Sequence, residues 1–331
     1  PVSCPYLEKK KTSDGQVSVM SGSELVNLMK GRDLILVDVR SPKEYKSQRL
    51  MKAINLPATP EMAVTKPDAK AVLQSVARMG KFVLRTRTKE RKKTVVMSAD
   101  GKDGPEDPAR IIADVLSDAK DLYILDGGFK AFSQQYPMAV GKISLPWFPS
   151  VLLENILFLG SEDDAKHLAH LEGFGITHIL NVSSDVKNYH ENRFKYLRIN
   201  LPDEVKSDLR AHFQKGFEFL KPEKGKRVLI HCHQGVSRSS TMTIAYLMHS
   251  KQWSLSDSYH FVLARRPEIR PNPGFWKQLA EFEIQLFGKT TIDDCIDLEK
   301  EIEEYQAKNM PDDDLGEEIG EHDTDGLCSR S

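Results

Sequence analysis

A cysteine and an arginine stand six residues apart in the stretch "VLIHCHQGVSRSST", Val228–Thr241. An apolar run leads into Cys232, a loop containing Gly235 follows, and helix-compatible residues begin near Arg238. The start of a helix offers backbone N–H groups that bind an anion and stabilise a thiolate. Glycine lets such a loop curl tightly, and an arginine fork can hold two phosphate oxygens. The pattern predicts nucleophilic displacement at phosphorus through a cysteinyl-phosphate intermediate.

The alternative interpretation is a buried structural cysteine, which is the usual role of a lone cysteine. Here the pair is accompanied by His231 before the cysteine and Ser239 after the arginine, at a strand-to-helix junction. That combination favours catalysis. We therefore expect the loop to hold the substrate phosphate through His233, Gln234, Gly235, Val236, Ser237 and Arg238.

The elements around this loop alternate between strand and helix signals. Short apolar runs at 33–40, 93–98, 121–129, 154–160, 176–183, 195–201 and 226–232 predict strands. Helical patterns lie between them, and Asn272 followed by Pro273 predicts a helix start. Alternation of this kind predicts α/β domains built on mainly parallel sheets flanked by helices. Tyr136–Ser150, rich in proline and glycine, is typical of an interdomain linker.

The 331-residue length predicts two domains. No apolar run approaches the roughly 20 residues that span a bilayer, and the first residues lack a signal-peptide core. Four scattered cysteines indicate free thiols and a reducing compartment, cytoplasmic or nuclear. We expect no membrane or nucleic-acid partner and a monomer.

The net charge of −1 hides an asymmetry. Residues 291–325 carry 15 Asp and Glu against two Lys, and Arg330 follows, so residues 1–290 sum to +11. A basic body suits an anionic substrate or an acidic partner. The acidic segment predicts one amphipathic helix followed by a disordered tail over 289–331.

The second half of the chain resembles the dual-specificity branch of cysteine-dependent protein tyrosine phosphatases. His231-Cys232-x5-Arg238-Ser239 matches the phosphate loop of that family, and "NILFLGS", "GITHILNVS", "YLRINLPDE" and "RPNPGFWKQLAEFE" match in order. The resemblance covers about 145–288 and implies that Cys232 is the nucleophile. It also implies that Arg238 binds phosphate, that Ser239 assists thiolate departure and that His231 orients the loop.

The reaction also needs a proton donor for the leaving oxygen. The resemblance places Asp203 of "INLPDEVKSDL" in that role, with Glu204 and Asp208 as weaker candidates; a solvated loop aspartate is the alternative. Asn272 resembles the asparagine that steadies the phosphate loop, although helix capping alone would also explain it.

The phosphate loop lacks the lysines that phosphoinositide phosphatases of this superfamily use to bind inositol phosphates, which favours a phosphoprotein over a lipid as substrate. The alternatives to a phosphoprotein phosphatase are a silent phospho-binding scaffold and a lipid or sugar phosphatase.

The first half, about 17–137, resembles the rhodanese fold in "LILVDVRSPKEY", "AINLP" and "LYILDGGFKAF". Ser98 occupies the place of the sulfurtransferase cysteine, so we expect no transferase activity. An inactive rhodanese-like domain followed by a dual-specificity phosphatase domain is the layout of mitogen-activated protein (MAP) kinase phosphatases. The resemblance implies a MAP kinase as substrate and partner. We expect no metal or other cofactor, because Arg238 and backbone amides supply the positive field.

A basic run between 78 and 93 has no assigned role. It holds eight basic residues against Glu90 and could attract an acidic docking groove. A solvated basic hairpin is an equal alternative. The candidate docking residues are Arg85, Arg87, Arg91, Lys92 and Lys93.

Overall fold

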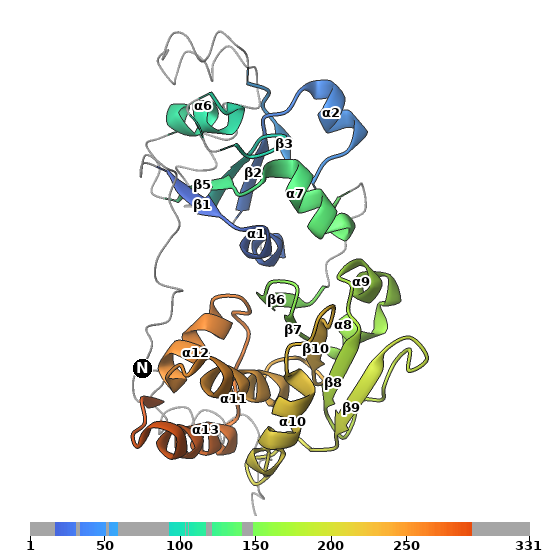
Figure 1. The fold of residues 1–331 in the computed structure, drawn as a ribbon, viewed down its shortest axis with the longest axis vertical. Helices are drawn as coiled ribbons and strands as arrows, with labels where there is room; N and C mark the ends of the chain where they lie inside the picture. Colours follow the sequence, from blue (N-terminus) through green and yellow to red (C-terminus); the bar gives the residue numbers. More distant parts are fainter. Residues whose placement is uncertain are drawn as a thin grey trace, which may run out of the picture.

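The structure, a computed structural model, describes residues 17–30, 34–50, 53–58, 93–102, 104, 106–116, 121–140 and 148–292. Two five-stranded sheets organise these residues, one in each half of the chain, and helices flank both (Figure 1). This confirms the predicted α/β class. Within the described ranges no helix combines the length and apolar character that crossing a membrane requires.

The first sheet has the order β1-β5-β4-β2-β3, and every neighbouring pair is parallel. Its strands are β1 (Ser18–Met20), β2 (Leu34–Asp38), β3 (Ile54–Asn55), β4 (Lys93–Met97) and β5 (Leu122–Leu125). Side chains of successive residues alternate between the two faces: Val96 packs on the α6 side, whereas Val95 and Met97 pack on the α1 and α7 side. Both faces are buried, which explains the continuous apolar runs in the sequence.

The described residues of this half form the helices α1 (Gly22–Leu28), α2 (Pro42–Ser47), α6 (Pro108–Val115) and α7 (Gly128–Gln135) and the short 3₁₀ turn η2 (Pro137–Ala139). Three of them begin at side-chain caps. Ser21 and Ser41 each cap a helix with a glutamate three residues on, and Asp107 caps α6. Local sequence therefore fixes where these helices start.

The second sheet has the order β6-β7-β10-β8-β9, in which only the β6–β7 pair is antiparallel. Its strands are β6 (Ser150–Leu153), β7 (Leu157–Gly160), β8 (His178–Val182), β9 (Lys195–Ile199) and β10 (Val228–His231). Its helices are α8 (Glu162–Lys166), α9 (Leu168–Gly173), η3 (Arg210–His212), α10 (Phe213–Leu220), α11 (Arg238–Lys251), α12 (Leu255–Leu263) and α13 (Pro273–Phe287). The first eleven residues of α11 are all buried, so this helix is the centre of the helical layer.

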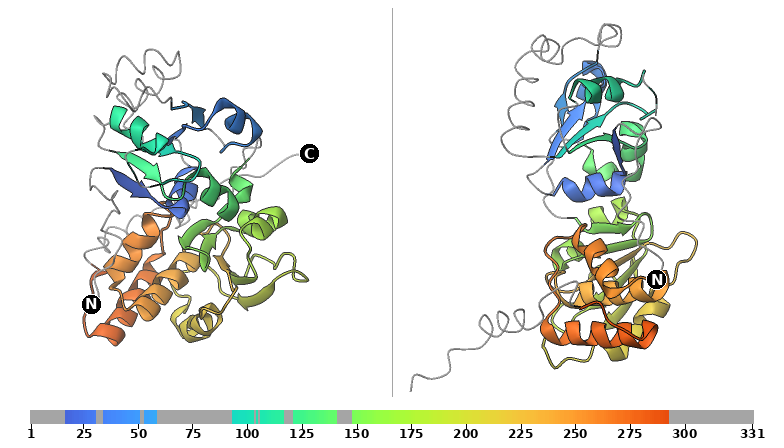
Figure 2. Two further views of the ribbon diagram at one scale, coloured as in Figure 1. Left: turned by 45° about the horizontal axis from the view of Figure 1, so that its top comes forward. Right: turned by 90° about the vertical axis from the view of Figure 1, so that its left-hand side faces the viewer.

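The two halves share one apolar core, and α1 lies against β6 (Figures 1 and 2). The Asn27 side chain donates to the Val151 carbonyl at 2.8 Å and accepts from the Val151 N–H at 2.9 Å. Lys30 donates to Ser150 Oγ at 2.8 Å. Tyr136, which the sequence assigns to a linker, is 2 % exposed and packs against Phe132. The prediction of an interdomain linker over Tyr136–Ser150 is therefore wrong at Tyr136, whose side chain is part of the packed core.

Candidate active site

Cys232 follows directly on β10, the central strand of the second sheet, and α11 begins at Arg238. Residues 232–238 therefore form the turn from the central strand into the buried helix, as the sequence predicts. Cys232 is 1 % exposed and Arg238 4 %. The turn lies at the carboxyl ends of β7, β8 and β10, which run parallel, the edge at which open α/β sheets bind ligands.

Four successive carbonyl groups of this turn are bound from outside. The pairs are Glu162 N–H to His233 O at 2.8 Å, Arg266 Nη2 to Gln234 O at 3.0 Å, Arg266 Nε to Gly235 O at 2.8 Å and Arg270 N–H to Val236 O at 2.8 Å. The described chain has no cis peptide bond, so the N–H of each next residue faces the other way. The N–H groups of residues 234–237 consequently turn inward. Inward-facing backbone amides of this kind form a concave surface suited to binding an anion.

The Cys232 sulfur lies beside that surface. Gly235 N–H donates to Sγ at 3.3 Å, and the Ser239 hydroxyl donates to Sγ at 3.2 Å. Gly235 has φ +73°, and a Cβ there would stand 2.4 Å from Gly160 O. Glycine is required at this position because both the backbone and the space exclude a side chain. Two hydrogen-bond donors of the loop and of α11 therefore point at the sulfur atom.

Arg238 is anchored on two acidic loops. Its Nη1 lies 2.7 Å from Asp185 Oδ1 and 3.2 Å from the Leu201 carbonyl, and its Nε lies 3.4 Å from Asp203 Oδ2. Burial alone would lower the pKa of Arg238, but the hydrogen bond to Asp185 and the negative charges of Cys232, Asp203 and Asp185 together raise it. Burial likewise opposes ionisation of Asp185, but hydrogen bonds from Arg238 and Ser183 lower its pKa to about 2. Both groups are therefore charged at neutral pH.

Asp203 lies on the loop after β9 and reaches the same turn. Its Oδ1 accepts hydrogen bonds from Ser237 Oγ at 2.7 Å and from Asn272 Nδ2 at 2.8 Å. Asn272 also caps α13 through a bond from Phe275 N–H, and its backbone N–H donates to Ser237 Oγ of the turn at 3.2 Å. The turn, the Asp203 loop and the start of α13 are thereby joined.

Comparison with known proteins decides the family. A profile described as "Dual specificity phosphatase, catalytic domain" matches residues 157–285, and a "Rhodanese-like domain" profile matches 21–135. Mouse dual specificity protein phosphatase 14 is 39 % identical over 138 residues, which are 41 % of this chain and 70 % of the relative. The chain belongs to the dual specificity phosphatase family. It carries a rhodanese-like domain in front of the phosphatase domain.

This chain spans only a minor part of the length of some other curated relatives. A probable rhodanese domain-containing dual specificity protein phosphatase of Dictyostelium discoideum is 33 % identical over 178 residues, 50 % of this chain. This chain spans 37 % of that relative and 13 % of mouse protein phosphatase Slingshot homolog 1. The crystal structure of human DUSP28 has 31 % identity and a TM-score of 0.41, covering 44 % of this chain and 99 % of that one.

His231 is the last residue of β10, directly before the phosphate loop, and is fully buried. Its Nδ1 is 3.1 Å from the Cys232 carbonyl, and within the described ranges its Nε2 has no hydrogen-bond partner. Burial lowers the pKa of His231 to about 4. The neutral ring therefore serves the loop as a spacer and hydrogen-bonding group.

The side chain of His233 stands at the rim of the loop and is 56 % exposed. Its Nδ1 lies 3.3 Å from Asp185 Oδ2, and its Nε2 lies 3.6 Å from Glu162 Oε2. Glu162 in turn accepts a hydrogen bond from Tyr189, which lowers the pKa of its carboxyl group. Among the loop residues expected to hold phosphate, the side chains of His233 and Ser237 thus contact carboxylates, and the backbone is left for the anion.

The equivalent turn of the rhodanese-like domain follows β4 and begins at Ser98. The Ser98 hydroxyl donates to Asp107 Oδ2 at 3.0 Å and accepts from Gly101 N–H at 3.0 Å. Ser98 is 2 % exposed. One amide of this turn is therefore occupied by the serine itself, and no sulfur atom is present at the position.

Several predicted features fall outside the described residues: Arg85, Arg87, Arg91, Lys92 and the acidic segment from 293 onward. Lys93 opens β4 and is exposed. The docking prediction therefore stays a prediction. Glu204 and Asp208 lie near Asp203 in sequence, but Glu204 pairs with Lys206 and Asp208 caps Ala211.

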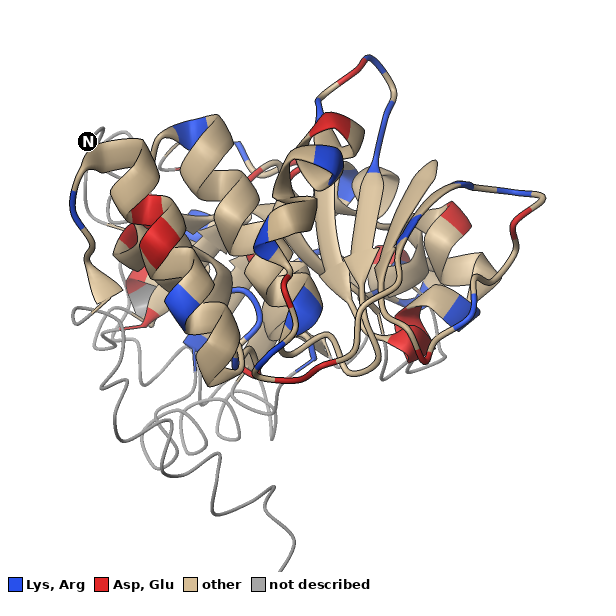
Figure 3. Ribbon diagram, turned by 90° about the horizontal axis from the view of Figure 1, so that it is seen from below, with Lys and Arg blue, Asp and Glu red and all other residues tan. Residues whose placement is uncertain are grey.

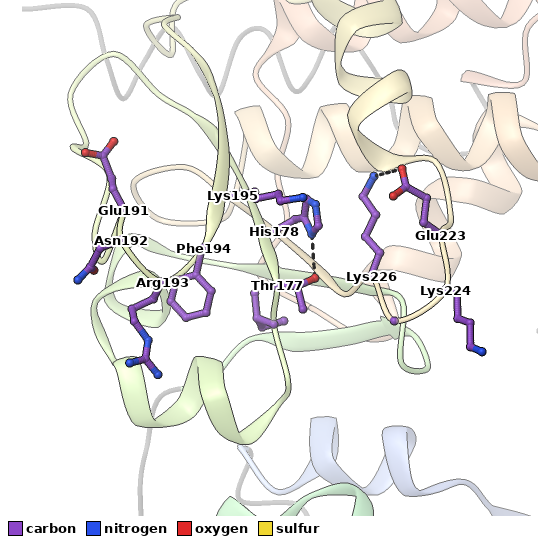
Figure 4. A pocket seen from close by; sticks show the side chains of 12 residues that line it. Thr177, His178, Glu191, Asn192, Arg193, Phe194, Lys195, Glu223, Lys224 and Lys226 are labelled. Carbon is purple, nitrogen blue, oxygen red and sulfur yellow. Dashed lines mark hydrogen bonds and ion pairs between the residues drawn. The ribbon is translucent and has the colours of Figure 1, made fainter.

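At least two hollows are lined by described residues of the phosphatase domain. A cavity of about 560 Å³ lies between the domains and is lined by loop residues His233 and Gln234, by Arg266 and by Lys30 of α1. A groove of about 580 Å³ lies at the opposite edge of the sheet, where β8 and β9 begin (Figure 4). On the side of the molecule that Figure 3 shows, the loops carry both basic and acidic residues. Only the first hollow adjoins the phosphate loop.

Sequence patterns missed Asp185, Glu162 and Arg266, which all contact the loop. Asp185 and Glu162 follow strands β8 and β7, so the rule that ligand sites form at the carboxyl ends of parallel strands could have flagged them. Arg266 carries no such signal because its partners are backbone carbonyl groups.

Proposed function

We propose that this chain is a cysteine-dependent protein phosphatase that hydrolyses phosphotyrosine and phosphoserine or phosphothreonine through a cysteinyl-phosphate intermediate. The observation that carries the proposal is the Cys232 sulfur beside four inward-turned amides and the Arg238 guanidinium. Family membership supports the same reaction.

In the first step the Cys232 thiolate attacks phosphorus and the bond between phosphorus and the ester oxygen breaks. The departing oxygen takes its proton from Asp203. Because Asp203 Oδ1 already accepts two hydrogen bonds, we propose that this proton is carried by Oδ2, which lies 3.4 Å from Arg238 Nε. Arg238 and the loop amides stabilise the charge on the equatorial oxygens throughout.

In the second step water attacks phosphorus and gives a proton to the Asp203 carboxylate. The sulfur–phosphorus bond breaks and Cys232 leaves as a thiolate, stabilised by the Ser239 hydroxyl. Inorganic phosphate is released and Asp203 is protonated again. Protein groups supply every charge that these steps need, so we propose that no metal or cofactor takes part.

The substrate we propose is a phosphoprotein, and specifically a MAP kinase. The support is the order of the two domains, since a rhodanese-like domain precedes a dual specificity phosphatase domain. The basic charge of residues 1–290 suits a phosphorylated segment. We further propose a monomer that acts inside the cell.

The test is hydrolysis of a small aryl phosphate in EDTA, with orthovanadate as inhibitor. Doubly phosphorylated kinase peptides and phosphoinositide vesicles are compared in the same buffer. We expect turnover of the aryl phosphate and peptides that vanadate abolishes. Turnover of phosphoinositides alone would replace the proposed substrate, and phosphopeptide binding without turnover would indicate a scaffold.

A further inference from the structure

Arg266 lies three residues beyond the end of α12 and contacts the outer side of the phosphate loop. Its side chain is only 6 % exposed, whereas arginine side chains are mostly exposed unless they are paired. Nε donates to Gly235 O at 2.8 Å and Nη2 donates to Gln234 O at 3.0 Å, while Nη1 pairs with Glu268 at 3.1 Å. One guanidinium group therefore holds two successive peptide groups.

The direction of those peptide groups decides where the loop amides point. In a trans peptide the C=O and the following N–H lie on opposite sides. Fixing the Gln234 and Gly235 carbonyls outward therefore turns the N–H groups of Gly235 and Val236 inward. The Gly235 N–H, which reaches the Cys232 sulfur at 3.3 Å, has this direction.

The fit between Arg266 and the loop is mutual. A Cβ on Gly235 would stand 2.5 Å from Arg266 Nη2, so the guanidinium occupies the space that the missing side chain leaves. A planar fork with fixed donor directions can span two carbonyls, whereas the ammonium of a lysine is a point charge. Lysine can satisfy only part of this arrangement.

The outer side of Arg266 faces the interdomain cavity, which it lines together with Glu268, Lys30 and exposed residues such as Lys166. Without the guanidinium, water can enter there and satisfy the two carbonyl groups. Water would not fix their direction. Removing the Arg266 guanidinium should therefore weaken anion binding by the loop more than it lowers the free energy of unfolding.

From this geometry we infer that Arg266 is a positioning residue for the phosphatase reaction: it orients the amides of Gly235 and Val236 toward the substrate phosphate. The inference rests on the proposed function only for the kinetic readout, because anion binding can be measured without turnover.

The experiment compares Arg266→Gln and Arg266→Lys with wild type in the full chain, with Arg265→Gln as matched control. Arg265 is the adjacent arginine, and its guanidinium stacks on the Phe261 ring and donates to the Phe261 carbonyl at 3.2 Å. Aryl phosphate kinetics, orthovanadate affinity by calorimetry and the melting temperature are measured for each. Losing two charge-assisted hydrogen bonds predicts KM and the vanadate Kd rising roughly 10- to 100-fold for Arg266→Gln.

For Arg266→Gln we expect kcat to fall by a smaller factor than KM rises. Arg266→Lys should recover part of the lost affinity, and Arg265→Gln should have wild-type values. A vanadate Kd for Arg266→Gln within twofold of the Arg265→Gln value overturns the inference, as does a loss explained entirely by the unfolded fraction. If wild type binds vanadate but hydrolyses nothing, the proposed function fails and the Arg266 comparison still stands on Kd.

Discussion

Asp185 Oδ1 and Arg238 Nη1 lie 2.7 Å apart, so the guanidinium expected to clamp phosphate is already held by a carboxylate. Asp185 comes from the segment after β8, 53 residues before Arg238. The Arg238 side chain is 5 % exposed whereas that of Asp185 is 48 % exposed. The buried Arg238 guanidinium is thus paired with a partly exposed carboxylate. This contact holds the arginine side chain in place in the absence of substrate.

Asp185→Asn should weaken phosphate binding because the amide no longer attracts the Arg238 charge. We expect KM for an aryl phosphate to rise by about tenfold at most, since the site is half-exposed, with kcat changed less. Steady-state kinetics at pH 7 measure both constants. A fall in KM would show instead that Asp185 competes with phosphate for the guanidinium.

Asp203→Asn should separate substrates by how much proton donation their leaving oxygen needs. A phosphoserine or phosphothreonine peptide leaves an alkoxide, so turnover should fall by roughly 10²- to 10⁴-fold. An activated nitrophenyl ester needs little proton donation and should be affected far less. Asp208→Asn is the control, because that exposed carboxylate caps Ala211. Equal losses on both substrates would argue against Asp203 as the proton donor.

Gly235→Ala should abolish anion binding. The substitution combines a left-handed backbone, φ +73°, with a Cβ 2.4 Å from Gly160 O. Gly225→Ala is matched in backbone, φ +79°, but meets nothing within 4 Å, so it should lose only about 1 kcal/mol of stability. Vanadate calorimetry and denaturant unfolding distinguish the two. Retained vanadate binding in Gly235→Ala would mean that the loop tolerates a different shape.

His231 should make stability depend on pH. Burial lowers its folded pKa from 6.5 to about 4, so the unfolded chain binds the proton more tightly. Its contribution is complete above pH 6.5 and is lost as pH falls toward 4, amounting to about 3 kcal/mol. Urea unfolding at several pH values should show a steeper decline for wild type than for His231→Asn. Parallel curves would contradict the burial of a neutral ring.

The sequence predicts those parts of the site that depend on local chain order. Cys232 and Arg238 lie on one strand–turn–helix unit, and Asn272 with Pro273 starts α13 as its residue types require. The alternating elements likewise predict two mainly parallel sheets. These features follow from periodicity, capping and turn chemistry, which act over a few residues.

Contacts between distant segments carry no such signal. Arg266 binds backbone carbonyls 31 and 32 residues away, and any residue type could supply a carbonyl. Asn27 pairs with the backbone of Val151 across 124 residues for the same reason. Tyr136 looks like linker beside proline, yet its ring packs between Phe132 and Phe174, which only the tertiary fold brings together.

Trapping the intermediate tests the central claim most directly. The full chain is mixed with a ³²P-labelled phosphopeptide, quenched in acid within the first turnover, digested and sequenced. The account predicts label on the peptide that contains Cys232, and neither label nor turnover in Cys232→Ser. Turnover by Cys232→Ser, or turnover by wild type without label on that peptide, would contradict it.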